Sequence, residues 1–157
     1  MTQIEFVKCV EGCQKQVRRF LTALCCGDSM RADDIAQDAF IKAYLSCDSV
    51  RDEEKFVRWI HRIAYNTFIS SQRVVKTSVP LDELYSIESG NRSDASFKYQ
   101  ELYAALDKLS EKERTAILLF YMEGYDIKEI AEITDSTIDA VKQLLKRGRE
   151  HLKHILR

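Results

Sequence analysis

Residues that interrupt helices are rare in this chain, whose 157 residues include one proline and five glycines. Apolar residues recur three or four positions apart over long stretches, as on one face of an α-helix, and no stretch shows the sustained alternation of a half-buried strand. Hydrophobic residues make up 45% of the chain, enough for one ordinary core or two small ones. The sequence therefore predicts an all-α protein.

The helical periodicity fails in one place, and this interruption divides the chain into two parts. Residues 77–96, TSVPLDELYSIESGNRSDAS, contain the only proline and six serine or threonine residues, a composition typical of a flexible linker. Before the linker, periodic apolar residues predict a three-helix domain over residues 1–76, with Ser29 as a possible cap of its second helix. After it, they predict a domain of about four helices over residues 97–157, in which Ser110 opens a helix with a capping box.

The stretch DIKEIAEITDSTIDAVKQLLKRGREHL, residues 126–152, has the pattern of two short helices joined by a tight turn. The small side chain of Ala131 allows a second helix to cross closely, as a helix-turn-helix requires. Thr137 can cap the second helix, whose first turns would then point into a DNA major groove. The residues expected to touch base edges or nearby phosphates are Thr137, Asp139, Lys142, Gln143 and Lys146. The expected packing face comprises Ile138, Val141, Leu145 and Leu152.

A formal net charge of -1 hides two basic segments. Residues 137–157 carry six basic and two acidic side chains, a balance of +4, and residues 51–76 carry six and three, a balance of +3. Between them, residues 77–114 carry five basic and eight acidic side chains, a balance of -3. Because phosphate attraction acts over roughly 8 Å at physiological salt, local charge governs DNA contact more than the total does. A solvated helix face remains the alternative for each basic run.

Other classes of site have little support in the sequence. Five cysteines, an odd number within apolar helical pattern, favour a reducing compartment over a disulfide framework. Cys9 and Cys13 can share a helix face but lack two further zinc ligands, so small buried side chains are the better interpretation. No apolar run approaches the roughly 18 residues that cross a bilayer, and the first residues lack a signal pattern. We expect a cytoplasmic protein without membrane insertion, metal or cofactor.

Catalysis also lacks a candidate constellation in the sequence. No glycine-rich phosphate loop is present, and His61, His151 and His154 have no evident nucleophile or carboxylate constellation. The sequence thus predicts a binding protein and not an enzyme.

Two further blocks, DDIAQDAFIKAY at residues 33–44 and FVRWIHRIAYNTFISSQR at residues 56–73, carry a family resemblance. Together with residues 105–152, they resemble a bacterial sigma-70 family factor of the short, extracytoplasmic-function (ECF) type. The first block is similar to region 2.2 of that family, the second to regions 2.3 and 2.4, and the C-terminal part to region 4. A helix-turn-helix alone is common, whereas both parts in this order with a linker between them are a specific signal.

The resemblance implies an alternative sigma factor that binds core RNA polymerase and directs promoter-specific transcription initiation, recognising the -10 and -35 elements and assisting promoter melting. The implied partners are the β′ clamp helices and β flap of RNA polymerase, promoter DNA and an anti-sigma factor. Its polymerase-binding residues would be Asp34, Gln37, Asp38 and Phe40. Those at the -10 element would be Arg58, Trp59, Arg62, Asn66 and Arg73, with the loop 46–54 accepting a flipped base. Those at the -35 element would be Thr137, Asp139, Lys142, Gln143, Lys146, Arg147 and Arg149.

The residues themselves leave alternatives to these assignments. The Asp34, Gln37 and Asp38 side chains share a helix face, which periodicity alone would interpret as a solvated acidic face. Trp59 follows Phe56 at helical spacing, so a core role is open to it. A free-standing helix-turn-helix regulator that dimerises on a palindrome would need only the C-terminal domain, and it would leave the N-terminal patches without a function.

The sequence departs from the family pattern in both parts. Asp135 stands where region 4 commonly has a glycine in its turn, and aspartate tolerates a left-handed conformation better than most residues but less well than glycine. Ser136 replaces a residue that is often apolar, and Ile138 replaces one that is commonly polar. At residues 74–75 two valines replace the usual basic cluster, which weakens the expected phosphate contact there.

Overall fold

The computed structural model describes residues 2–50, 52–77 and 96–156, and every regular element in these ranges is helical, which confirms the predicted all-α fold class. The predicted linker, residues 77–96, lies almost entirely outside the described residues. No helix within the described ranges combines the length and the apolar character needed to span a bilayer. The helices are α1 (Gln3–Leu24), α2 (Ser29–Leu45), η1 (Cys47–Ser49), η2 (Glu53–Lys55), α3 (Phe56–Thr77), α5 (Ser96–Asp107), α6 (Glu111–Tyr121), α7 (Ile127–Thr134) and α8 (Ile138–Ile155).

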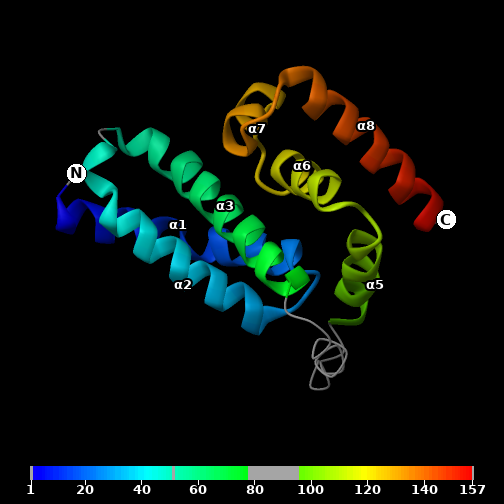
Figure 1. Cartoon of the computed structure of the whole chain (residues 1–157), viewed down its shortest axis with the longest axis horizontal. Helices are drawn as coiled ribbons and strands as arrows, with labels where there is room; N and C mark the ends of the chain where they lie inside the picture. The colour runs from blue at the N-terminus through cyan, green and yellow to red at the C-terminus, as the bar shows by residue number, and fades with distance from the viewer. Residues whose placement is uncertain (1, 51, 78–95, 157) are drawn as a thin grey trace.

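The N-terminal helices α1, α2 and α3 pack against one another as a bundle (Figure 1). Helix α2 buries a face of alanines spaced three or four apart, and the small side chains let its neighbours approach closely. These alanines, each 0% exposed, are Ala32, Ala36, Ala39 and Ala43. Large side chains of α1 and α3, including Phe20, Ile60 and Phe68, fill the space between the helices. These side chains and the alanines of α2 make up the N-terminal part of the buried core.

Helix ends follow capping chemistry, with one change from the predicted position. Helix α2 begins at Ser29, but its N-cap is Asp28, whose carboxylate accepts a hydrogen bond of 3.1 Å from the Arg31 N–H. The prediction of Ser29 as the cap is thus wrong by one residue. Gly27 has a φ of 94°, and this left-handed turn places Asp28 in the capping position. The capping box at Ser110 is confirmed by reciprocal bonds of 3.2 Å with Glu113.

In the C-terminal domain, α6 packs against α8 and α7, and α5 contacts α8 as well as α1 of the other domain (Figure 1). Helix α8 crosses α6 at Gly148, where an added Cβ would lie 2.7 Å from Cγ1 of Ile117. A larger residue there would push the two helices apart, so this glycine sets how closely α8 docks. Val141 and Leu145, 0% and 1% exposed, complete the buried face of α8.

The two domains pack directly on each other, an arrangement that the sequence did not predict. The guanidinium of Arg114 in α6 is buried and donates to the Leu24 carbonyl of α1 at 2.8 Å, and to the carbonyls of Leu106 and Leu109 at 2.8 and 3.2 Å. Gly27, after α1, lies so close to Tyr103 of α5 that an added Cβ would approach its ring to 2.7 Å. Buried apolar side chains from both domains form one continuous core.

The five cysteines, all within the described residues, form no disulfide, and three of them are shielded by the packed helices. Burial raises the pKa of the Cys26 thiol to about 11, with Arg114 opposing the shift and Asp107 adding to it. Burial also raises the pKa of Cys13 to about 11 and that of Cys25 to about 12. Thiolates are therefore scarce at these positions at neutral pH, as expected for side chains that serve in packing.

Because Cys26 is only half-buried, its alkylation rate should report this pKa directly. Between pH 7 and 10 the rate with iodoacetamide should rise about tenfold per pH unit, since only the thiolate reacts. In the unfolded chain the alkylation rate of the same thiol should stop rising above about pH 9, because the thiol is then already ionised. Peptide mass spectrometry after timed labelling measures both rates, with circular dichroism confirming the fold at each pH. A plateau near pH 9 in the folded chain would contradict the assignment.

Candidate nucleic-acid interface

The outer face of α2 presents the residues predicted to bind polymerase. Asp34, Gln37 and Asp38 are all exposed, whereas Phe40 is half-buried under the guanidinium of Arg18, 5.9 Å from its ring centre. The structure thus brings three of the four residues onto one surface and turns Phe40 toward the core. Two large apolar side chains that sequence reasoning missed extend this surface at helical spacing: Ile41 and Leu45, 59% and 77% exposed. We call Asp34, Gln37, Asp38, Ile41 and Leu45 the α2 stripe.

Helix α3 carries the residues predicted to meet the -10 element, which we call the α3 stripe: Arg58, Trp59, Arg62, Asn66 and Arg73. Arg62, Asn66 and Arg73 are exposed, and Arg58 and Trp59 are half-buried. The Trp59 ring lies 5.6 Å from that of Phe56, so one part of it packs on the core. Another part lines a cavity of about 220 Å³ together with Arg58 and Arg62. The core role that the sequence left open for Trp59 is thus present for one part of the ring, and its role at the -10 element stays a prediction.

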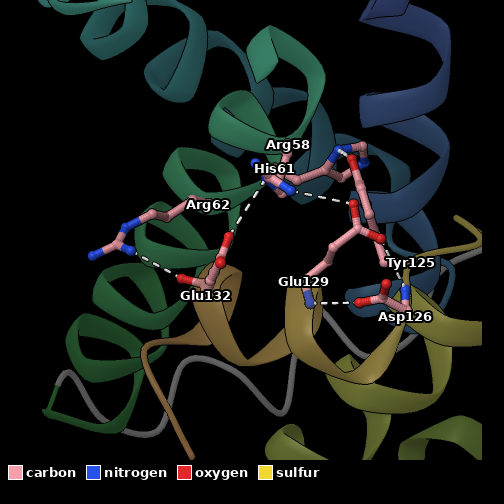
Figure 2. Close-up of polar contacts among 7 residues, drawn as sticks. All are labelled: Arg58, His61, Arg62, Tyr125, Asp126, Glu129 and Glu132. Atoms are coloured by element: carbon pink, nitrogen blue, oxygen red, sulfur yellow. Dashed lines mark hydrogen bonds and ion pairs between the residues drawn. The ribbon is translucent and has the colours of Figure 1, made fainter. Parts of the chain in front are cut away.

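Two cations of the α3 stripe, Arg58 and Arg62, contact α7, the first helix of the helix-turn-helix (Figure 2). Arg58 Nη1 lies 3.3 Å from a carboxylate oxygen of Glu129, and its Nε lies 3.7 Å from one of Glu132. Arg62 Nη1 donates to the Glu132 backbone carbonyl at 2.9 Å. Two residues assigned to DNA are thus engaged within the chain. Sequence patterns could not reveal this contact, because it joins residues about 70 positions apart.

A buried polar cluster lies next to these contacts, between the two domains. His61, 0% exposed, donates from Nδ1 to the Val57 carbonyl at 2.8 Å, and the Tyr125 hydroxyl lies 3.0 Å from the same nitrogen. Its Nε2 lies 3.6 Å from a carboxylate oxygen of Glu123, which also accepts a 2.7 Å hydrogen bond from Gln16. Burial raises the pKa of Tyr125, and the nearby Glu123 adds to the effect. The phenol therefore stays protonated at neutral pH.

The histidines have carboxylate partners that the sequence did not make evident. His61 faces Glu123, as described, and His151 Nδ1 lies 3.1 Å from a carboxylate oxygen of Glu113. The sequence offered no catalytic constellation around these histidines, and it did not reveal these two pairs either. Both pairs join different helices or turns, so only the tertiary fold brings them together.

Helix α8 has the geometry expected of a recognition helix. The Thr137 hydroxyl caps it by accepting from the Ala140 N–H at 3.1 Å, and the preceding Asp135 adopts a left-handed φ of 53°. Its outer face is exposed at every residue predicted to contact the -35 element, namely Thr137, Asp139, Lys142, Gln143, Lys146, Arg147 and Arg149. Ile138, which the pattern placed on the packing face although it looked exposed at a commonly polar position, is 45% exposed. Ile138 is the first residue of α8, and the burial of this helix begins at Val141.

Comparison with known proteins identifies both parts of the chain. The family model described as Sigma-70 region 2 matches residues 9–76, and the model described as Sigma-70, region 4 matches residues 99–152. The chain belongs to the sigma-70 family. The region 2 match contains the α2 and α3 stripes, and the region 4 match contains α6, α7 and most of α8. A free-standing helix-turn-helix regulator, which would need only the second part, is not favoured.

Relatives place this sigma factor in the ECF group. It is 35% identical over 146 residues to the ECF RNA polymerase sigma factor SigW of Bacillus subtilis, covering 83% of this chain and 78% of that protein. It is 32% identical over 132 residues to the ECF RNA polymerase sigma-E factor of Escherichia coli, covering 74% and 69%. The solved sigma factor RpoE of Bartonella quintana, in complex with the anti-sigma factor NepR, superposes with a TM-score of 0.80 at 26% identity and 96% coverage of both chains.

The structure accommodates two of the departures of this sigma factor from the region 4 pattern, those at Asp135 and Ser136. Asp135 takes the left-handed conformation that a glycine would otherwise supply at the end of α7. The hydroxyl of Ser136, in place of an apolar side chain, lies 2.7 Å from that of Thr134, within hydrogen-bond distance. The turn is thus built by polar contacts. The side chains of residues 74 and 75, where the basic cluster is missing, lie outside the described residues.

Proposed function

We propose that this sigma factor recruits core RNA polymerase to particular promoters in the cytoplasm, reads the -35 element with α8 and the -10 element with the α3 stripe, and assists promoter melting. The observation that carries the proposal is the presence of both matched regions in one chain, each with a surface of the required chemistry. The protein acts by binding and not by catalysis.

The α2 stripe is the proposed surface for the β′ clamp helices of polymerase. Its acidic end, Asp34 and Asp38, suits basic partner side chains, and its apolar end, Ile41 and Leu45, suits a dry contact. Large exposed apolar side chains next to a charged patch are typical of an interaction surface. The exposed Ile41 and Leu45 therefore support a docked partner over the simple solvated face that periodicity left open.

On DNA, the two halves would have separate tasks. The exposed cations of α8 would hold duplex phosphates, while the first turns after Thr137 approach base edges in the major groove. The α3 stripe offers an indole for stacking, an amide for base edges and guanidinium groups for phosphates, the combination that binds an unpaired strand. The loop 46–54 would accept a flipped base. The C-terminal domain would also dock on the β flap.

An anti-sigma factor is a further proposed partner. The RpoE sigma factor, which covers nearly the whole of this chain, was solved with the anti-sigma factor NepR. This likeness supports a similar inhibitor here, one that covers surfaces needed for polymerase or DNA.

In vitro transcription from a genomic library, with core polymerase plus this protein, tests the proposal. We expect a limited set of promoters that share -10 and -35 sequences and are silent with core enzyme alone. Deoxyribonuclease footprints should require polymerase together with this protein. Specific footprints by the chain alone, without any effect on start sites, would contradict the proposal and support a free-standing regulator.

Replacing Lys142 and Lys146 with alanine should weaken promoter binding by the holoenzyme. Each phosphate contact that is lost means that about one counterion fewer is released on binding. The slope of the logarithm of the binding constant against the logarithm of the salt concentration should therefore become shallower by about two. Both side chains are exposed, so the fold should be unaffected. Electrophoretic mobility shifts on a promoter from the library, at several salt concentrations, measure the slope. The matched control replaces exposed Lys8 and Lys15 of α1, and an equal loss of slope there would refute the assignment.

A further inference from the structure

We infer that Ile138, the first residue of α8, contacts the C5-methyl group of a thymine in the promoter and thereby helps to select the -35 sequence. The inference deepens the proposed function, because it rests on the placement of α8 at the -35 element. It adds to the proposed contact residues one that the periodic pattern assigns to the packing face. The group that Ile138 would recognise is an apolar methyl on the edge of a base pair, and not a phosphate.

The first support is the exposure of Ile138 on a helix whose other branched apolar residues are buried. Val141 and Leu145 are 0% and 1% exposed, whereas Ile138 is 45% exposed. A single exposed apolar side chain is common on protein surfaces and indicates no function by itself. Here its position gives it meaning, because the first residues of a recognition helix are those that reach base edges in the major groove.

The second support is the chemistry of the first turn of α8. Residues 137–140 include no positive charge, and the cations of the exposed face begin with Lys142. The side chains of Ile138 and Asp139 have no donor for a phosphate oxygen, so this turn is unsuited to the DNA backbone. Both suit base edges in the major groove, where a carboxylate accepts from the amino group of cytosine and an apolar side chain contacts the methyl group of thymine. The first turn would therefore read sequence while the later cations hold phosphates.

The third support is that the start of α8 is held in one conformation. The Ser136 N–H donates to the Ala131 carbonyl at 2.9 Å, and the Thr137 hydroxyl accepts from the Ala140 N–H at 3.1 Å. Side chains of a helix tilt toward its N-terminus, so that of Ile138 projects past the end of α8. Its β-branched side chain also has one strongly preferred rotamer in a helix. A contact made by such a preorganised group loses little conformational entropy on binding.

The thymine methyl group can be removed without changing the base pairing, because deoxyuridine lacks only that group. We would replace each -35 thymine of either strand in turn by deoxyuridine, in a promoter from the library, and measure binding of the holoenzyme made from core polymerase and the full chain. With the wild type, one replacement should weaken binding about fourfold, as expected for one buried methyl group. With Ile138→Ala the same replacement should change binding by less than about 1.5-fold, since the methyl group has lost its partner.

The matched control is Ile4→Ala, the same substitution at an isoleucine of α1 that is 72% exposed. This variant should show the full fourfold effect of the methyl group. Ile138→Val keeps the β-branched shape and should retain most of the effect. Because Ile138 is exposed, the melting temperature of Ile138→Ala, followed by circular dichroism, should stay within about 3 °C of the wild type.

The deoxyuridine series decides for or against the contact. A methyl effect at one thymine that disappears in Ile138→Ala and persists in Ile4→Ala supports the inference. The absence of a methyl effect at every position, or an equal effect with the wild type and Ile138→Ala, overturns it. The variant with both Lys142 and Lys146 replaced separates this failure from that of the proposed function. If its salt slope still becomes shallower, α8 remains the reader of the -35 element without a methyl contact, whereas an unchanged slope removes α8 from that element.

Discussion

Replacing Arg114 with alanine should lower the free energy of unfolding by about 3 kcal/mol, since it removes a buried charged donor that serves three carbonyls. These carbonyls end α1 and α5, so the guanidinium joins the C-terminal ends of two helices from different domains. The helix dipole favours a positive charge at that point. Urea unfolding followed by circular dichroism and by Trp59 fluorescence measures the change, and coincident curves would show a single transition.

Two companion variants make the Arg114 result interpretable. Arg114→Lys keeps the charge but loses the planar fork, so it should recover only part of the lost stability. Arg19→Ala, at an exposed position of α1, should change stability by less than about 0.5 kcal/mol. If Arg114→Ala were no more destabilising than Arg19→Ala, the three carbonyl contacts would not contribute to the fold as described.

Reversing charge at Asp34 and Asp38 should weaken binding to core polymerase by about 100-fold, because like charges would face each other at the proposed clamp-helix contact. Both side chains are exposed on α2, so the melting temperature should be preserved. Surface plasmon resonance on immobilised core enzyme measures the affinity of the Asp34→Lys, Asp38→Lys double variant. Transcription from promoters of the library should fall in parallel.

The control for this variant reverses two other exposed carboxylates, Glu11 and Glu101, and should retain full affinity for polymerase. Ile41→Ser tests the apolar end of the same stripe and should weaken binding about tenfold through lost apolar contact. Retained affinity after reversal of both aspartates would exclude the α2 stripe as the polymerase contact, and another surface of the chain would have to serve.

Local patterns were sufficient for the elements of this fold and for one of its surfaces. The capping box at Ser110, the Thr137 cap and the exposed face of α8 all depend on residues within one or two helical turns. The error at Ser29 also has a local origin. Asp28, next to Ser29, can serve as the N-cap as well, and the left-handed turn at Gly27 places Asp28 in that position. Spacing alone could not make that decision.

What the sequence could not predict depends on contacts between distant segments. The pairing of Arg58 with α7, the burial of His61 against Glu123 and the insertion of Arg114 beneath α1 each join residues more than 60 positions apart. Each involves a charged or titratable side chain, for which exposure is the usual expectation. The apolar end of the α2 stripe was missed for the opposite reason, since large apolar side chains are usually buried and Ile41 and Leu45 are exposed.

The double engagement of Arg58 bears on how this sigma factor tolerates mutation. A substitution of Arg58 weakens its ion pairs with Glu129 and Glu132 and, at the same time, its proposed contact with promoter DNA. These two losses have opposite effects on transcription. Single-residue scans would therefore record a muted phenotype, and double substitutions would show strong epistasis. Covariation across these three positions is the expected evolutionary signature, with the arginine retained only while its acidic neighbours are.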